Sequence, residues 1–382
     1  MKILALEPFY TGSHKSFLAG WQSESRHNWT IIGLPGYKWK WRMRHAPITF
    51  AQDLQQRLAQ GESWDALFCS DMLALHEFYG LMPRLADLPS VYYFHENQFT
   101  YPEQDESKRD YQYAFTNLLS AHVADEVWFN SEYHREDFLT AAEQFLTRMP
   151  DYSPIELPDL IRKKSQVQSP GIVSPGIENS MRTQNFSQPL HILWAARWEF
   201  DKNPETFFAA LSILQSQQKR FRVSVIGEQF KNSPRIFKQA TDQFINEIHH
   251  FGFLPTQEAY LHALIEADVF VSSAIHEFFG IGCVEAIAHG CYPLAPKRLA
   301  YPETVGLIPE KQPDEFFYDG STEQLADKLT KLIGKHESKE RLFNDSPSRG
   351  VTAMQNFHWK TRAKEMDDRI DVVKVAAAGY RS

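Results

Sequence analysis

The stretch that decides the fold is "VFVSSAIHEFFGIGCVEAIAHGCYPLAP", residues 269–296. It begins with a short β-branched run, passes through the loop "HEFFGIG", and continues into an apolar segment that carries Glu285 and stops at Gly290. β-Branched residues favour a strand, and a glycine after an apolar segment favours the end of a helix. The order strand, loop, helix and next strand predicts one unit of a parallel α/β sheet.

The loop of this unit predicts a binding site. A loop at a helix N-terminus presents unpaired N–H groups and the positive end of the helix dipole to a phosphate or sugar oxygen. Glu277 lies before the loop glycine and Glu285 lies in the following helix, with seven residues between them. Carboxylates accept hydrogen bonds from the vicinal hydroxyls of a ribose or hexose. The alternative is that Glu277 caps the helix and Glu285 is merely solvated.

The same alternation of strands and helices extends toward both ends of the chain, with an interruption at residues 165–189. This interruption is rich in Ser, Pro, Gly and Gln and predicts a linker. We therefore predict an N-terminal domain over 1–170, a C-terminal domain over 190–355, and a terminal helix in 356–382 that crosses back to the first domain. Two doubly wound, Rossmann-like domains would face a central cleft, where the carboxyl ends of parallel strands bind ligands.

Composition narrows the class of protein. A formal net charge of -8 over 382 residues argues against indiscriminate binding to nucleic acid or membranes. The three cysteines lack CxxC spacing, which predicts reduced thiols. No run approaches the ~20 apolar residues that a membrane span needs. We expect a soluble, cytoplasmic protein.

One local segment departs from the acidic balance. In "GYKWKWRMRH", residues 36–45, Lys38, Lys40, Arg42 and Arg44 alternate with aromatic residues and a methionine. In an extended segment this pattern predicts one cationic and one aromatic face. Such a ribbon suits the docking of a polyanion. The alternative is a sheet edge whose charges block aggregation.

The glutamate loop and its surroundings resemble retaining GT-B glycosyltransferases related to glycogen synthase. "AARWEFDKNPETF" and "HFGFLPTQEAYLHALIEADVFVSS" carry the rest of this resemblance, while Phe278 stands where that family commonly has glycine. The resemblance implies that Arg197 and Lys202 grip the donor diphosphate, that Glu277 is catalytic, and that His95 touches the donor sugar. The remaining donor-binding residues that it implies are Gly252, Phe253, Leu254, Phe278, Phe279, Gly280, Ile281 and Glu285.

The N-terminal half is more specific. "LEPFYTGSHKSF", "GYKWKWRMRH" and "YFHENQFTYP" are similar to the tRNA-queuosine α-mannosyltransferase family. This resemblance implies transfer of mannose from GDP-mannose, with retention of configuration, to the cyclopentenediol of queuosine in the anticodon of tRNA(Asp). The acceptor-binding residues expected on this basis are Gly12, Ser13, His14, Lys38, Lys40, Arg42, Arg44, Asn97 and Gln98.

No cofactor or metal is expected. GT-B relatives stabilise the departing diphosphate with side chains and a helix dipole, and the chain contains no D-x-D motif. Two alternatives stay open. One is a GT-B glycosyltransferase with another nucleotide sugar and a lipid, glycan or other small-molecule acceptor. The other is a catalytically inactive RNA-binding protein. A lipid acceptor is disfavoured here because the basic segment has a period of two, whereas membrane binding favours an amphipathic helix.

Overall fold

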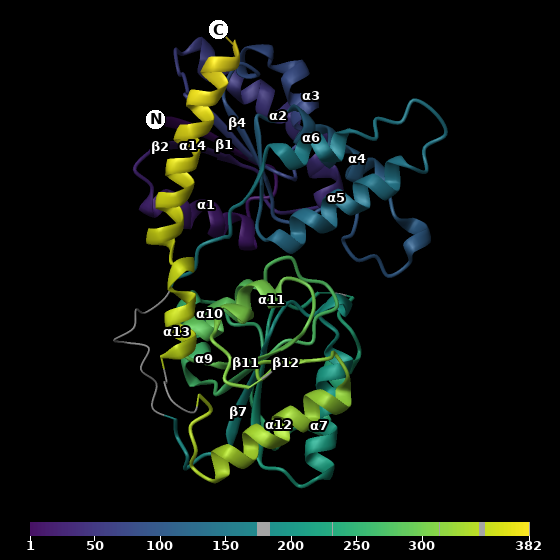
Figure 1. Ribbon diagram of the computed structural model, residues 1–382, viewed down its shortest axis with the longest axis vertical. Helices are drawn as coiled ribbons and strands as arrows, with labels where there is room; N and C mark the ends of the chain where they lie inside the picture. The colour runs from purple at the N-terminus through teal and green to yellow at the C-terminus, as the bar shows by residue number, and fades with distance from the viewer. Residues whose placement is uncertain (174–183, 231, 313, 344–347, 382) are drawn as a thin grey trace. The chain divides into compact units, whose positions relative to one another are not determined.

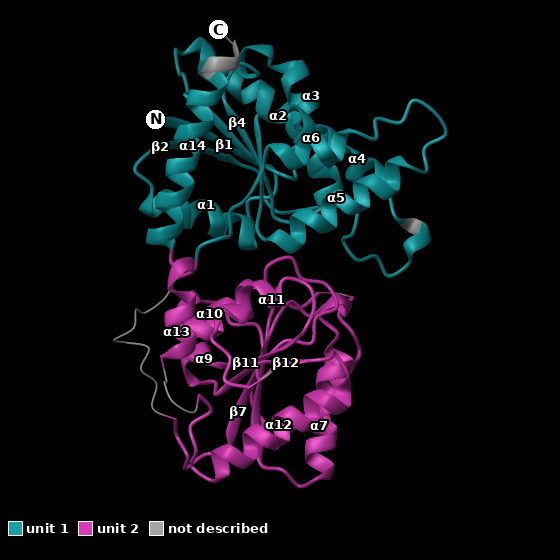
Figure 2. Cartoon of the chain, viewed as in Figure 1, with its two compact units in different colours: residues 1–171, 359–382 teal, residues 172–358 magenta. Residues whose placement is uncertain are grey.

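The computed structural model describes residues 1–173, 184–230, 232–312, 314–343 and 348–381. The chain forms two compact units (Figure 2). Unit 1 comprises residues 1–171 and 359–382, and unit 2 comprises residues 172–358. Part of the predicted linker, residues 174–183, lies outside the described residues. The prediction of a linker is wrong for Ser165–Val167, because this segment is a strand that pairs with the preceding strand of unit 1.

Unit 1 is a parallel sheet with helices on its faces (Figure 1). Its strands are β1 (Lys2–Glu7), β2 (Asn28–Gly33), β3 (Ala66–Ser70), β4 (Ser90–Phe94), β5 (Glu126–Phe129) and β6 (Ser165–Val167), in the order β2-β1-β3-β4-β5-β6. Its helices are α1 (Gly12–Glu24), α2 (Trp39–Ala59), α3 (Leu75–Leu81), α4 (Tyr111–Val123), α5 (Glu132–Leu146), α6 (Leu157–Lys163) and α14 (Trp359–Arg381), with short 3-10 turns at Pro83–Leu85 and Glu106–Lys108. Every residue of β3, β4 and β5 is buried, as expected of parallel strands covered on both faces.

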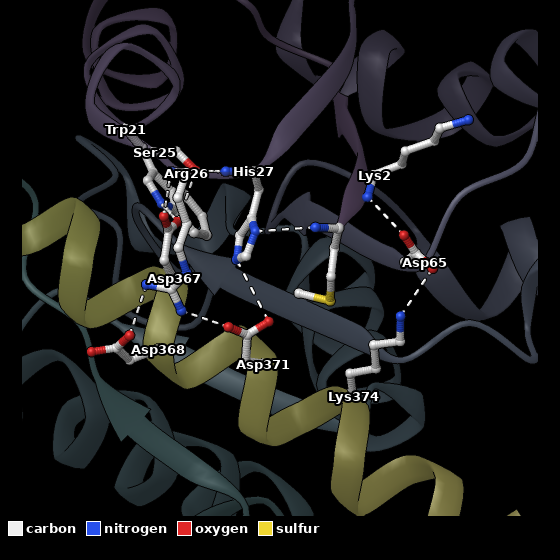
Figure 3. Close-up of polar contacts among 11 residues, drawn as sticks. Lys2, Trp21, Ser25, Arg26, His27, Asp65, Asp367, Asp368, Asp371 and Lys374 are labelled. Atoms are coloured by element: carbon white, nitrogen blue, oxygen red, sulfur yellow. Dashed lines mark hydrogen bonds and ion pairs between the residues drawn. The ribbon is translucent and has the colours of Figure 1, made fainter.

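Helix α14 is fastened to unit 1 by polar contacts as well as apolar ones (Figure 3). The buried Asp367 carboxylate accepts hydrogen bonds from Trp21 Nε1, Ser25 Oγ and the Arg26 backbone N–H, each at 2.8 Å. About two turns further along α14, Lys374 Nζ pairs with Asp65 Oδ1 at 2.9 Å. The end of the chain therefore completes the core of the unit that contains its beginning.

Unit 2 repeats the architecture with a different strand order. Its strands are β7 (Leu190–Ala195), β8 (Phe221–Ile226), β9 (Ile248–Gly252), β10 (Val269–Val271), β11 (Tyr292–Pro296) and β12 (Phe317–Tyr318), in the order β12-β11-β10-β7-β8-β9, all parallel. Its helices are α7 (Pro204–Ser216), α8 (Ile236–Gln243), α9 (Gln257–Glu266), α10 (Ile281–Ala288), α11 (Tyr301–Thr304), α12 (Thr322–Glu337) and α13 (Arg349–Ala353), with 3-10 turns at Phe200–Lys202, Val305–Leu307 and Met354–Phe357.

Both sheets contain a topological switch point. The strand order reverses between β1 and β3 in unit 1, and between β7 and β10 in unit 2. Ligands of doubly wound folds bind outside the carboxyl ends of the strands at such a point. The expected fold, two Rossmann-like doubly wound domains, is confirmed for each unit.

The segment "GYKWKWRMRH" is not extended, which corrects the prediction of an alternating ribbon. Helix α2 begins at Trp39 and continues to Ala59. Its buried positions include Met43, Ala46, Phe50 and Leu54, which recur every three or four residues as a helical core face requires. Burial of this face over about three turns, from Met43 to Leu54, outweighs the short alternation at the start of the helix. Within the described residues, no helix is long and apolar enough to cross a membrane.

Candidate active site

The loop between β10 and α10 lies at the switch point of unit 2. Gly280 stands immediately before α10 with a φ of 82°, in the left-handed region that favours glycine. A Cβ atom at this position would lie 3.0 Å from Cε1 of Tyr301. The loop bounds a small cavity of about 30 Å³, which is lined among others by Lys202, Glu277, Gly280, Gly282 and Tyr301.

Lys202 and Glu277 form the charged centre of this cavity. Lys202 Nζ lies 3.3 Å from Glu277 Oε2 and 3.1 Å from Asp201 Oδ2, and donates to the His276 carbonyl at 2.9 Å. Burial alone would raise the pKa of Glu277, but Lys202 holds it below its usual value. Burial would likewise lower the pKa of Lys202, but Glu277 and Asp201 raise it. Both groups are therefore charged at neutral pH, and the ammonium stands beside the N-terminus of α10, where an anion is favoured.

Arg197, the other predicted cation, lies in the segment between β7 and Lys202 and is exposed. Its guanidinium pairs with Glu199 at 3.2 Å. Lys202 and Glu277 are thus in direct contact. Arg197, which like Lys202 follows β7, lies at the surface.

Glu285 is half-buried in α10, and its carboxylate has a polar partner in α9. Its Oε2 accepts a hydrogen bond of 2.8 Å from the hydroxyl of Tyr260 in α9. Burial raises the pKa of Glu285 to about 7, and the Tyr260 hydrogen bond acts in the opposite direction. Glu285 is therefore not merely solvated. Its carboxylate is poised to change charge near neutral pH.

The remaining predicted donor residues divide into buried and exposed groups. Phe278 packs against His276 at a ring distance of 4.4 Å and Phe279 against Phe357 at 5.4 Å, so both side chains belong to the interior. Only their backbone is available for a ligand. Ile281 is the first, half-buried residue of α10. Gly252 ends β9, Phe253 is 60% exposed, and Leu254 is half-buried.

Unit 1 holds a second polar cluster at its own switch point. Glu7 ends β1, His14 lies in the first turn of α1, Asp71 follows β3, and His95 follows β4. Glu7 Oε2 lies 3.2 Å from His14 Nδ1, and the His95 backbone N–H donates to Asp71 Oδ1 at 2.9 Å. The rings of His14 and His95 are in contact, with centroids 3.9 Å apart and planes tilted by 33°.

The charges of this cluster are set by its burial. Burial alone would lower the pKa of His14, but Glu7 and Asp71 raise it to about 9. The pKa of His95 is held well below its usual value by burial and by the neighbouring His14. The pair is therefore an imidazolium in contact with a neutral imidazole. Burial raises the pKa of Asp71 well above its usual value.

Glu7, His14 and His95 each place one potential metal-ligand atom within 4.8 Å of the others. Their ring geometry fits a metal poorly. Two imidazoles on one tetrahedral ion, each bound at about 2.0–2.1 Å, would have centroids roughly 5 Å apart. The observed distance between the ring centroids is shorter, at 3.9 Å. The contacts fit a histidine–carboxylate ion pair instead.

Asn97 and Gln98 of the "HENQF" loop are predicted to bind the acceptor, but their side chains form hydrogen bonds with neighbouring residues of the same segment. Asn97 is fully buried, and its Oδ1 accepts from the backbone N–H groups of Phe99 at 3.0 Å and Thr100 at 3.1 Å. Gln98 Nε2 donates to Glu96 at 3.2 Å. These contacts favour a structural role for Asn97.

The other predicted acceptor residues lie elsewhere in unit 1. Gly12 and Ser13 are exposed at the start of α1, whereas His14 is buried. Lys38, Lys40 and Arg44 are exposed at the start of α2. Arg42 is half-buried and donates to the Pro35 carbonyl at 2.8 Å.

Sequence reasoning missed Glu7, Asp71, Asp201 and Tyr260. The first two stand directly at the carboxyl ends of predicted strands, which is the signal that could have identified them. Asp201 adjoins the predicted Lys202. Nothing in the sequence links Tyr260 to Glu285, because the hydrogen bond joins two different helices.

Comparison with known proteins gives the two units separate matches. Residues 2–172 match the family described as tRNA-queuosine alpha-mannosyltransferase N-terminal, and residues 177–349 match glycosyl transferases group 1. Among solved structures, sucrose-phosphate synthase from Thermosynechococcus elongatus is similar with a TM-score of 0.69 at 14% identity, covering 98% of this chain and 100% of that chain. The catalytic domain of starch synthase IV from Arabidopsis thaliana gives a TM-score of 0.69 at 13% identity, covering 98% and 99%. These likenesses establish the GT-B fold.

A relative in sequence is the tRNA-queuosine alpha-mannosyltransferase of Drosophila melanogaster. It is 36% identical over 309 residues, which cover 79% of this chain and 81% of the relative. Identity at this level over most of both chains shows common descent, and the group 1 domain adds the enzyme class. The chain is a glycosyltransferase and belongs to the tRNA-queuosine alpha-mannosyltransferase family.

Proposed function

We propose that this enzyme transfers mannose from GDP-mannose to the queuosine of tRNA(Asp) in the cytoplasm, with retention of configuration. The observation that carries the proposal is the Lys202–Glu277 pair, which stands before the N-terminus of α10 in a chain 36% identical to a tRNA-queuosine alpha-mannosyltransferase. The Anabaena protein HepE, which shares the fold with a TM-score of 0.68 at 15% identity over 97% of this chain and 100% of that chain, was solved with UDP. A nucleoside diphosphate in unit 2 is consistent with that precedent.

Each donor-site residue has a proposed role. Glu285 accepts hydrogen bonds from the ribose hydroxyls, while Lys202 and Arg197 neutralise the diphosphate as point charge and planar fork. Glu277 orients the mannose hydroxyls. The N-terminus of α10 adds positive potential where charge develops on the leaving group. The exposed Phe253 and the neighbouring Gly252 and Leu254 flank the base, while Phe278 and Phe279 contribute backbone groups alone.

The proposed chemical step is a same-face displacement. The bond between the anomeric carbon of mannose and the diphosphate oxygen breaks, and GDP leaves with the bonding electrons. A hydroxyl of the cyclopentenediol forms the new bond to the same face, and its proton passes to a donor phosphate oxygen. No protein nucleophile takes part. His95, which is neutral because of its lowered pKa, is proposed to hydrogen-bond the sugar.

The test is mass spectrometry of tRNA nucleosides. Purified enzyme should add one hexose to queuosine in tRNA(Asp) from GDP-mannose, and cells without the gene should lack this product. Transfer from a UDP- or ADP-sugar alone would identify another donor. Absence of any hexosylated nucleoside, together with sugar transfer to a lipid or glycan, would replace the proposed acceptor. RNA binding without turnover of any nucleotide sugar would indicate an inactive RNA-binding protein.

Activity is also expected without a divalent metal or cofactor, because Lys202, Arg197 and the dipole of α10 supply the positive charge. Turnover should survive EDTA when the tRNA is folded beforehand and its structure is checked separately. Loss of turnover that magnesium or manganese restores, with the tRNA still folded, would contradict this expectation.

A further inference from the structure

The start of α2 exposes aromatic rings among cations. Tyr37 and Trp41 are 65% and 64% exposed, and Lys38, Lys40 and Arg44 are exposed beside them in the sequence. These five residues are called the exposed face of α2 below. A tryptophan with most of its surface in water gains little from burial.

The helix sorts the aromatic residues of this segment into two groups. Trp39 packs at the apolar cluster formed by Met43, Met72 and Tyr113, and therefore has a structural role. Trp41 is rotated away from that cluster, because successive helical residues differ by about 100°. It lies with Arg44, three positions later, on the solvent side. The helix thus combines aromatic and cationic groups on one face, where an extended ribbon would have separated them.

The cations of this face are not neutralised by acidic side chains. In the described part of the chain, Lys38, Lys40 and Arg44 form no ion pair with Asp or Glu. Arg44 and Lys40 lie over the Tyr113 ring at 4.9 Å and 5.9 Å, and Lys38 over the Tyr37 ring at 5.5 Å. The first turn of α2 contains no acidic residue, so the helix dipole adds to the positive potential. In a chain of net charge -8, this is a local excess of positive charge.

The exposed face adjoins the polar edge of the unit 1 sheet. Gly36 is packed so closely on Thr11 that an added Cβ would lie 2.0 Å from its Cγ2 atom. Thr11 directly precedes the exposed Gly12 and Ser13, and Phe9 packs at the cluster of Trp39 and Met43. The face therefore lies beside the loop that follows β1, on the same edge as the Glu7–His14–His95 cluster.

We propose that the exposed face of α2 docks the single-stranded anticodon loop of the acceptor tRNA, with one base stacked on Trp41 and backbone phosphates bound by Lys38, Lys40 and Arg44. The proposal rests on the proposed function for its partner. Stacking on an aromatic side chain beside a cationic track is the usual means of holding unpaired bases. The neighbouring residue Tyr37 offers a second ring for an adjacent base.

A membrane surface fits the exposed face of α2 less well than RNA does, even though α2 is a helix. An interfacial helix inserts a broad apolar face into lipid. The apolar face of α2, which includes Met43, Ala46, Phe50 and Leu54, is already buried in unit 1. Only Trp41 and Ile48 remain as large exposed apolar side chains of the helix.

The test measures binding of a fluorescein-labelled RNA stem–loop, with the anticodon-arm sequence of tRNA(Asp), to the full-length enzyme across a salt series. Trp41→Ala should weaken binding by about 5- to 150-fold, the equivalent of one lost base stack. Trp41→Phe should restore most of the affinity. Lys40→Ser with Arg44→Ser should lower the slope of log affinity against log salt by about 1.4, or 0.7 for each lost phosphate contact.

The matched control is Lys360→Ser with Lys364→Ser. It removes the same charge from exposed positions of α14 in the same unit, away from the proposed face, and should leave affinity and slope unchanged. GDP binding by calorimetry should be equal in all variants, which shows that unit 2 is intact. Circular dichroism and thermal unfolding check unit 1.

The outcomes separate this inference from the proposed function. Unchanged loop binding by folded Trp41→Ala and Lys40→Ser/Arg44→Ser variants overturns the docking surface, even if the wild type mannosylates queuosine. Loss of binding to vesicles containing phosphatidylserine, with RNA binding retained, assigns the face to a membrane and also overturns it. If the wild type fails to mannosylate queuosine while these variants still lose the RNA loop, the docking surface stands and the proposed reaction fails.

Discussion

At the scale of single residues, the decisive contact is the one between Lys202 and Glu277. The two groups are 75 positions apart in the chain, and Asp201 completes their buried network. A buried ammonium that is held between two carboxylates cannot turn away from the site. Its charge is therefore fixed in position before the substrate arrives, which is the condition for electrostatic stabilisation of a leaving group.

Lys202→Ala is expected to lower kcat by about 10²–10³-fold, the usual effect of removing one preorganised group that stabilises developing charge. Asp201→Asn should give a smaller loss in kcat, with donor affinity reduced, because it loosens Lys202 without removing it. Steady-state kinetics with GDP-mannose measures both. Lys331→Ala, at an exposed pair on α12, is the control and should resemble the wild type. If Lys202→Ala changes only the KM of the acceptor, Lys202 does not act on the diphosphate.

Glu285 predicts a dependence of nucleotide binding on pH. Its pKa of about 7 is raised by burial, and the form that accepts hydrogen bonds from ribose is the carboxylate. Affinity for GDP should therefore increase as pH rises through 7 and should be about tenfold weaker at pH 6 than at full ionisation. The nearby His276 has a pKa lowered to about 4 and does not titrate in this range. Calorimetric titration from pH 5.5 to 8.5 measures the effect.

Two variants test the origin of that dependence. Glu285→Gln cannot ionise and should bind GDP weakly at every pH, keeping only the pH dependence that the terminal phosphate of GDP contributes through its own pKa of about 6. Tyr260→Phe removes the hydrogen bond that opposes the raised pKa, so its midpoint should move to higher pH. A wild-type slope that persists in Glu285→Gln would assign the titration to a different group.

Sequence alone predicts these proposed site residues in part. Glu277, Glu285 and Lys202 stand in recognisable motifs beside predicted strand ends, so their neighbourhood was predictable. Their partners were not, because Tyr260 and Glu285 meet only after α9 and α10 pack. His95 is a predicted site residue, but its lowered pKa comes from burial and from the charge of His14, which belongs to another strand-to-helix connection.

At the scale of elements, α2 shows why a short pattern fails. Over residues 36–45 the side chains alternate perfectly in type, which favours a strand when that window is taken alone. Over Trp39–Ala59 the buried positions recur at three and four residues, and this longer pattern determines the structure. Because α2 is a helix, the period of two in its sequence does not count against a lipid acceptor. The burial of the apolar face of α2 in unit 1 disfavours a membrane.

The element that presents the proposed donor site is α10, and the geometry of its N-terminus depends on Gly280. Gly280→Ala should strain the left-handed backbone by about 1–2 kcal/mol and press on the Tyr301 ring. We expect weaker GDP binding and slower turnover, with a modest loss of thermal stability. Calorimetry and kinetics on the purified variant measure these. Gly334→Ala is the matched control, because its Cβ would meet no atom within 4 Å inside α12. A Gly280→Ala enzyme with wild-type donor binding would mean that the loop backbone does not contact the donor.

At the scale of the whole molecule, the two units were predictable because the strand–helix alternation restarts after an interruption. The exact limits of the interruption were not predictable, because the edge strand β6 has three residues, too few to show the hydrophobic pattern of a strand. The role of α14 in unit 1 depends on contacts between residues as much as 346 positions apart, such as Trp21 and Asp367. Such pairs cannot be predicted from local sequence patterns.

Asp367 allows the contribution of α14 to unit 1 to be measured. Three donors converge on its buried carboxylate, from Trp21, Ser25 and the Arg26 backbone. Asp367→Asn replaces one acceptor oxygen by an amide that must face at least one of these donors. The variant should lose about 1–3 kcal/mol of stability, because a buried donor is left unsatisfied. Its neighbour Asp368 forms an exposed ion pair with Arg26 at 2.7 Å, so Asp368→Asn should cost at most about 1 kcal/mol.

Hydrogen–deuterium exchange followed by mass spectrometry reports the two units separately, which a single melting temperature does not. In Asp367→Asn, backbone amides of β1, β3 and β4 should exchange faster, while those of β7 and β8 keep their wild-type rates. Asp368→Asn should leave both sets nearly unchanged. Faster exchange confined to α14 would mean that the helix is only attached to a unit that is stable without it. Equal acceleration in both units would mean that they unfold as one, and α14 would then stabilise the whole chain and not unit 1 alone.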